Sequence, residues 1–117
     1  MMRVVFAESI VDELKDALKR LDFQRIVVAA YTVIEDGEVA SPEMTFSDVH
    51  GLDDVPCRQM WLRQGEHEQN IGLLTVYTMV FGDDLVILYA KAGHLIGIKE
   101  RNRIREVYRA ELSRRST

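Results

Sequence analysis

The side chains best suited to metal or acid–base chemistry gather in one acidic segment. The segment contains Asp48, His50, Asp53 and Asp54. A histidine among carboxylates can in principle bind a divalent cation. The spacing matches neither a calcium-binding EF-hand loop nor a zinc-binding His-Glu-x-x-His helix. A solvated acidic loop is therefore the favoured interpretation, and we predict no metal site there.

Three further candidates have ordinary structural explanations. Glu66, His67 and Glu68 occupy adjacent positions, where side chains diverge, which favours a polar loop. His94 lies between Gly93 and Leu95, and no serine, cysteine or acid is placed by sequence to work with it, which favours a turn histidine. Cys57 is the single cysteine, and we predict that it is a small buried hydrophobe and not a nucleophile. We predict no catalytic residue.

Phosphate-binding motifs are also missing from the sequence. It contains neither Gly-x-Gly-x-x-Gly nor Gly-x-x-x-x-Gly-Lys-Ser/Thr, the loops that hold phosphates at the N-terminus of a helix. We therefore expect no cofactor, and any nucleotide relevant to this protein would be bound by a partner.

Size and composition predict a single domain over residues 1–117. Of the 117 residues, 47% are apolar and 29% are charged, which is enough apolar surface for one core but not for two. The longest apolar runs, such as Ile26 to Tyr31, are too short to cross a bilayer, and no signal-peptide core follows the first residues. We expect a cytoplasmic protein without membrane association.

Charge is divided unevenly along the chain. Residues 1–90 carry seven Lys or Arg against sixteen Asp or Glu, whereas residues 91–117 carry eight against three. The basic end can bind an acidic partner, a nucleic acid or the acidic body of the same protein. Glutamates interrupt the basic run and no aromatic residues alternate with it, so we predict no nucleic-acid partner. The predicted partner-binding residues are Lys99, Arg101, Arg105 and Arg109.

The first half of the chain predicts a helix followed by a hairpin. Met2 to Phe6 indicates a short strand, and apolar residues at helical spacing predict a helix over Ser9 to Leu21. Gln24 to Ile34 is rich in β-branched residues and predicts a central strand, which Asp36-Gly37 would turn back on itself. Ser41 to Pro56 contains both prolines and is predicted to be a loop with at most one helical turn.

The second half predicts three strands and a helix. The predicted strands are Arg58 to Gln64, Leu73 to Phe81 and Leu85 to Lys91, the last two joined by a tight turn at Gly82. An amphipathic basic helix follows from Lys99. The fold class is therefore α+β, an antiparallel sheet of about five strands flanked by N-terminal and C-terminal helices.

Two stretches of the chain resemble the roadblock/dynein light chain family, which shares its scaffold with longin domains and profilin. Ile26 to Ser41 is similar to the first hairpin of that family. Asp84 to Lys99 is similar to its last strand, a short turn and the entry into the final helix, with Gly97 and Lys99 in matching places. The resemblance covers about a third of the chain. It implies a layered domain that forms homodimers and serves as a scaffold or regulator of a small Ras-like GTPase or of a motor assembly.

A second functional class remains open from the residues themselves. Odd-numbered side chains of the predicted strands share one sheet face, and they include Trp61, Tyr77, Met79, Phe81 and Tyr89. These residues could line a small-molecule pocket, as in sensor domains of the PAS or GAF type. An ordinary core, or a face buried by dimerisation, is the preferred interpretation. The leading hypothesis is thus a non-enzymatic regulatory or scaffolding domain, and a sensor module is the alternative.

Overall fold

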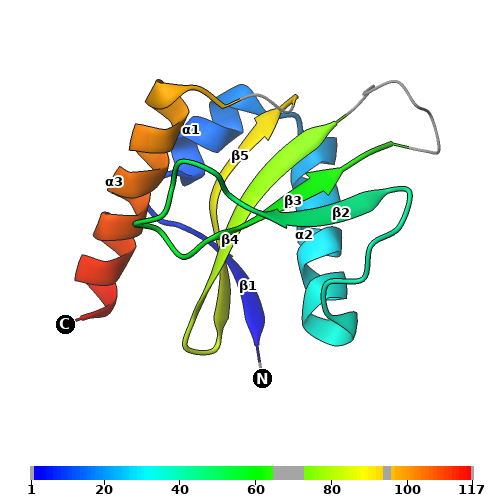
Figure 1. The fold of residues 1–117 in the computed structure, drawn as a ribbon, viewed down its shortest axis with the longest axis horizontal. Coiled ribbons are helices and arrows are strands. Elements are labelled where there is room, and N and C mark those ends of the chain that lie inside the picture. The colour runs from blue at the N-terminus through cyan, green and yellow to red at the C-terminus, as the bar shows by residue number, and fades with distance from the viewer. Residues whose placement is uncertain (1, 65–72, 94–95, 117) are drawn as a thin grey trace.

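The described chain begins with a short strand and two helices, continues through four strands and ends in a helix. The computed structural model describes residues 2–64, 73–93 and 96–116. The elements are β1 (Arg3–Phe6), α1 (Val11–Ala17), α2 (Arg20–Asp36), β2 (Met44–Asp48), β3 (Arg58–Leu62), β4 (Leu74–Phe81), β5 (Asp84–Ala92) and α3 (Ile98–Arg115). The predicted α+β class is confirmed (Figure 1).

The five described strands form one mixed sheet in the order β1-β5-β4-β3-β2. The run from β2 to β5 is an antiparallel meander, whereas β1 pairs with β5 in parallel, with Val4 opposite Leu85. The predicted number of strands is confirmed, and one parallel pair makes the sheet mixed and not wholly antiparallel. A parallel pair needs a long connection, which the chain between β1 and β5 provides.

Helices cover both faces of the sheet. On one face α2 packs over β1, where the ring centroids of Phe6 and Phe23 are 5.5 Å apart. On the other face α3 packs over the end of β4, where Phe81 and Tyr108 are 6.2 Å apart. Figure 1 shows α1 and α2 behind the sheet and α3 along its side, with the 49–57 loop reaching α3 in front. The result is a three-layer arrangement with buried apolar side chains on both faces of the sheet.

The largest difference from the sequence prediction is α2. Gln24 to Ile34 is helical, so the predicted central strand is wrong. The run contains enough apolar residues to satisfy both a strand and a helix, and its buried members Ile26, Ala29 and Ala30 have the i, i+3, i+4 spacing of a helix. Packing against the sheet therefore decides in favour of the helix.

The same difference changes the segments on either side. The predicted helix over Ser9 to Leu21 is two helices, because the backbone at Leu18 is extended and α2 starts at Arg20. Gly37 does not form a hairpin turn but ends α2, with a φ of 79° and an amide that donates to the Val33 carbonyl at 2.9 Å. The expected returning strand at Val39 and Ala40 is absent from this described segment.

Ser41 to Pro56 is also more ordered than predicted. It contains β2, which pairs with β3 and forms one edge of the sheet. The remaining predictions for the second half are confirmed, since β3, β4, β5 and α3 lie where the patterns indicate. Gly82 has a φ of 56° in the turn between β4 and β5, a conformation that favours glycine. The predicted 66–68 loop and His94 lie outside the described residues.

Candidate functional site

The four predicted partner-binding residues of α3 do not share one environment. Lys99 and Arg109 are exposed, whereas Arg101 is half-buried. The Arg101 side chain packs against Gly51, and its Cδ would lie 3.2 Å from a Cβ added to that glycine. Arg105 donates from Nε to Asp54 Oδ2 at 2.9 Å and from Nη2 to the Gly51 carbonyl at 2.7 Å. Arg101 and Arg105 therefore hold the 49–57 loop against α3.

Other charges of α3 connect it to the N-terminal part of the chain. Arg103 forms an ion pair with Glu13 and donates to the Ser9 carbonyl at 2.8 Å. Lys91 of β5 pairs with Glu100 at 2.9 Å. That contact, followed by hydrogen bonds from the backbone amides of Glu100 itself and of Gly97, lowers the pKa of Glu100 to about 2. Much of the basic charge at this end of the chain is thus used within the molecule.

Glu111 is the most deeply buried charged side chain of α3, with 1% of the residue exposed. It accepts hydrogen bonds from Arg114 at 2.8 Å, from Arg115 at 3.0 Å and from the Glu8 amide at 3.1 Å. Burial raises the pKa of Glu111, but these donors together outweigh it and the pKa falls below its usual value. Glu111 therefore has a structural role: it binds the end of α3 to the N-terminal segment.

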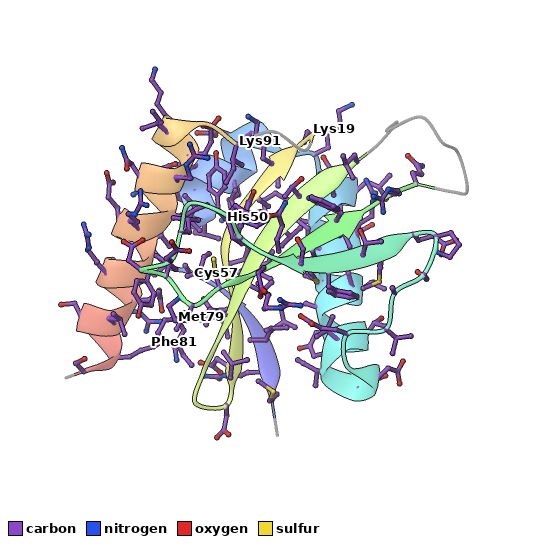
Figure 2. All side chains as sticks on the ribbon, viewed as in Figure 1. Lys19, His50, Cys57, Met79, Phe81 and Lys91 are labelled. Atoms are coloured by element: carbon purple, nitrogen blue, oxygen red, sulfur yellow. The ribbon has the colours of Figure 1, made fainter. Side chains whose placement is uncertain are left out.

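Arg115 extends this network to the sheet. It pairs with Asp84 at 2.9 Å, and Arg3 of β1 donates to the other oxygen of Asp84 at 2.7 Å. The guanidinium also lies 5.1 Å from the centre of the Phe81 ring. Figure 2 shows Phe81 and Met79 beside the C-terminal half of α3. The first and last described elements are therefore joined through β5.

The side chains of the acidic segment over residues 48–54 do not gather into one cluster. Among the described residues, no group of three or more His, Cys, Asp or Glu could bind an ion. Asp48 pairs with Arg58, Asp54 pairs with Arg105, and His50 is exposed (Figure 2). Cys57 is buried, as predicted, and burial raises the pKa of its thiol to about 11. At neutral pH the thiol is protonated and a poor nucleophile.

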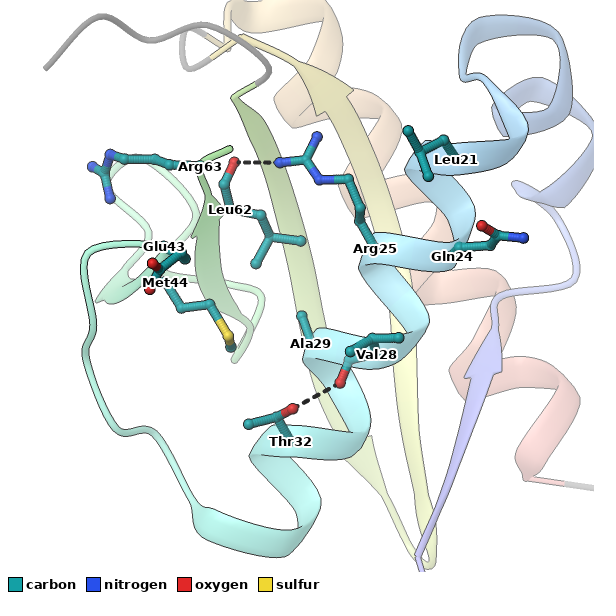
Figure 3. Close-up of a pocket in the computed structure, with 10 residues that line it drawn as sticks. All are labelled: Leu21, Gln24, Arg25, Val28, Ala29, Thr32, Glu43, Met44, Leu62 and Arg63. Carbon is teal, nitrogen blue, oxygen red and sulfur yellow. Dashed lines mark hydrogen bonds between the residues drawn. The ribbon is translucent and has the colours of Figure 1, made fainter. Parts of the chain in front are cut away.

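A groove between α2 and the edge of the sheet was not anticipated by the sequence patterns. It has a volume of about 370 Å³ (Figure 3). Its walls are Leu21, Gln24, Arg25, Val28, Ala29 and Thr32 of α2, together with Glu43, Met44, Leu62 and Arg63 beside or within β2 and β3. Figure 3 shows the two sets facing each other, with Met44 and Ala29 pointing into the space between them.

Three polar side chains of the groove already form hydrogen bonds within the protein, so its apolar side chains offer the main surface for contact with another molecule. Arg25 donates to the Leu62 carbonyl at 3.2 Å, Thr32 donates to the Val28 carbonyl at 2.9 Å, and Arg63 donates to Thr45 at 3.1 Å. The first two bonds are drawn in Figure 3. Because these polar groups already have partners, the chemistry of the groove favours apolar contact over proton transfer.

The outer surface of α2 continues this apolar character away from the sheet. Three large apolar side chains are exposed there, Leu21 by 59%, Val28 by 66% and Tyr31 by 42%. Together with Gln24 and Glu35 they follow a 3-4-3-4 spacing, which places all five on one line along the helix. We name these five residues the α2 stripe. The heptad-like spacing in the sequence was a usable signal, but the strand prediction concealed it.

Comparison with known proteins adds no constraint on this surface. No protein-family model, curated protein or solved structure matches the chain. Among the residues that the structure describes, no helix combines the length and the apolar character that crossing a bilayer requires.

Proposed function

We propose that this protein is a non-enzymatic regulatory or scaffolding domain that forms dimers and binds a protein partner. The contact surface is the α2 stripe with the adjoining groove. The main evidence for this contact surface is that Leu21, Val28 and Tyr31 are exposed on the outer face of a helix whose inner face is already buried in the core. Apolar side chains gathered in this way beside a concave apolar surface are characteristic of protein contact sites.

The distribution of ionisable groups supports a role without catalysis. Glu38, Asp54, Asp84, Glu100 and Glu111 all have lowered pKa values, and each forms an ion pair with an arginine or lysine of the same chain. The pairs are spread over the molecule and do not converge on the groove. Perturbed groups of this kind stabilise a fold, whereas an active site brings them together around a cleft.

The class of partner remains a prediction from the family resemblance. The first stretch behind that resemblance, Ile26 to Ser41, begins within α2 and forms no hairpin. The second, Asp84 to Lys99, includes a strand followed by the start of a helix, as the resemblance implies. A small Ras-like GTPase is therefore a candidate to test after the contact surface itself.

A small-molecule sensor is the second candidate, and one observation favours it. Tyr77 Oη and Trp61 Nε1 are buried with no hydrogen-bond partner among the described residues. Both side chains lie on the sheet face that α3 partly covers, and Tyr77 is fully buried. A ligand that accepted their hydrogen bonds would relieve the cost of two unsatisfied donors.

The deciding experiment is the solution mass by light scattering over a concentration series. The proposal predicts a dimer near twice 13.5 kDa, and it predicts that Val28→Glu raises the dimer dissociation constant at least about tenfold. Ile98→Glu is the matched control, since Ile98 is 70% exposed at the start of α3, which packs on the other face of the sheet from α2. A wild-type protein that stays monomeric at all concentrations would overturn the dimer proposal and direct attention to ligand screening.

A further inference from the structure

We infer that the α2 stripe binds the same stripe of a second copy of this chain, with the two helices antiparallel. This inference rests on the proposed dimer and specifies its interface. Val28 is the central residue of the 17-residue helix α2 and the most exposed apolar side chain of the stripe. The two-fold axis of the dimer passes close to it.

The charges at the ends of α2 are the main argument for this arrangement. Lys19 and Arg20 stand at the N-terminal end, and Glu35 and Asp36 stand at the C-terminal end; all four are exposed. A helix has partial positive charge at its N-terminus and partial negative charge at its C-terminus. These four side chains therefore oppose the dipole of their own helix, and only Asp22 in the first turn follows it. Their placement costs stability in the monomer and needs another use.

An antiparallel second copy provides that use. Reversing the direction of α2 places the basic end of one helix beside the acidic end of the other, twice in each dimer. With the axis near Val28, Arg20 of one copy lies at the same level along the helix axis as Asp36 of the second copy. The two helix dipoles are also antiparallel, which is favourable. A parallel pair would place like charges together at both ends, so the charge pattern selects one orientation.

The apolar positions agree with the same orientation. Val28 of each copy meets the centre of the other helix, where Tyr31 contributes its ring, and Leu21 lies further out on each side. The 3-4 spacing of the stripe is the spacing that keeps a seam along two helices packed at a shallow angle. Gln24 and Glu35 are the polar members, and polar positions within such a seam help to select register.

Charge reversal at the two ends provides a direct test in the full-length chain. One variant carries Lys19→Glu and Arg20→Glu, and the other carries Glu35→Lys and Asp36→Lys. Both variants improve the match to the helix dipole, so neither is expected to unfold the monomer. Each variant alone should raise the dimer dissociation constant roughly tenfold, because like charges now meet at both ends. An equimolar mixture should recover wild-type affinity as a heterodimer, since opposite charges meet again.

Cysteine cross-linking provides an independent measure of the orientation. Val28→Cys should form a disulfide-linked dimer on mild oxidation, because the two residues flank the axis. Arg20→Cys should not, since its two copies would lie about 24 Å apart along the helices. The wild-type protein is the background control, because its cysteine, Cys57, is buried.

The outcomes separate this inference from the function on which it rests. A stable dimer by light scattering that is not weakened by either charge variant alone, that shows no rescue on mixing, or that cross-links through Arg20→Cys would overturn the antiparallel interface and leave the dimer standing. A monomer at every concentration would overturn both. Rescue on mixing together with the Val28→Cys cross-link is the result that we expect.

Discussion

The two long helices use their outer surfaces in opposite ways. α3 is rich in charge, and Arg103, Arg105 and Arg115 bind acidic groups of α1, the 49–57 loop and β5. α2 carries its exposed charge at its ends and exposes apolar side chains along its middle. A high density of charge therefore does not by itself identify a binding surface. Charges that already have partners in their own chain stabilise the fold, and exposed apolar side chains remain available to another molecule.

The largest expected effect compares one aliphatic truncation on each helix. Ile104 of α3 is fully buried and Val28 of α2 is 66% exposed. Ile104→Ala should lower the free energy of unfolding by about 3 kcal/mol, because it leaves a cavity in the core. Val28→Ala should change it by less than about 0.5 kcal/mol when the protein is dilute enough to be monomeric. Urea unfolding measures both, and equal losses would show that the two helices do not differ in this way.

The next effect concerns the buried carboxylate of α3. Glu111→Ala removes the acceptor shared by Arg114, Arg115 and the Glu8 amide. We expect a loss of about 2 kcal/mol, less than for a fully buried pair because both arginines are partly exposed to water. Glu106→Ala on the same helix is the control, since the Glu106 side chain is 64% exposed. A loss no greater than that of the control would contradict the structural use of Glu111.

A smaller effect depends on pH. The folded-state pKa of Glu100 is about 2, below its ordinary value of 4.5. Its contribution to stability is therefore complete above pH 4.5 and is lost as the pH falls toward 2. The wild-type protein should be more stable than Glu100→Gln at pH 6, and the difference in unfolding midpoint should shrink steadily between pH 4.5 and pH 2. A difference that stays constant over this range would show that the Lys91–Glu100 pair does not stabilise the start of α3.

The smallest effect is expected where the sequence pattern predicted the contact. Reversing charge with Arg101→Glu and Arg105→Glu should leave the dimer dissociation constant within about twofold of wild type, because these side chains pack on the 49–57 loop. Circular dichroism would verify that the variant is folded. A loss of dimer comparable to that of Val28→Glu would move the dimer interface from α2 to α3.

The sequence prediction missed the α2 stripe because it assigned a strand to residues that form a helix. Leu21, Val28 and Tyr31 fall on one face only if residues 20–36 form a helix. The continuous apolar run from Ile26 to Ala30 fits the two-residue period of a strand as well as the 3.6-residue period of a helix. Its β-branched residues favoured a strand by local preference. For the basic residues of α3 the reverse holds: their helix was predicted, but an acidic partner such as Glu13, which pairs with Arg103, lies 90 residues away in the chain.

Local patterning was sufficient for the α+β class, the β4–β5 turn at Gly82, the basic helix at the C-terminal end and the burial of Cys57. Those features follow from periodicity and turn chemistry within a few neighbouring residues. Tertiary packing decided that residues 20–36 are helical, that β1 joins the sheet in parallel and which charges are paired. These outcomes depend on contacts between distant segments. Only the folded chain brings a helix onto a sheet or an aspartate onto an arginine, and those contacts outweigh local preference.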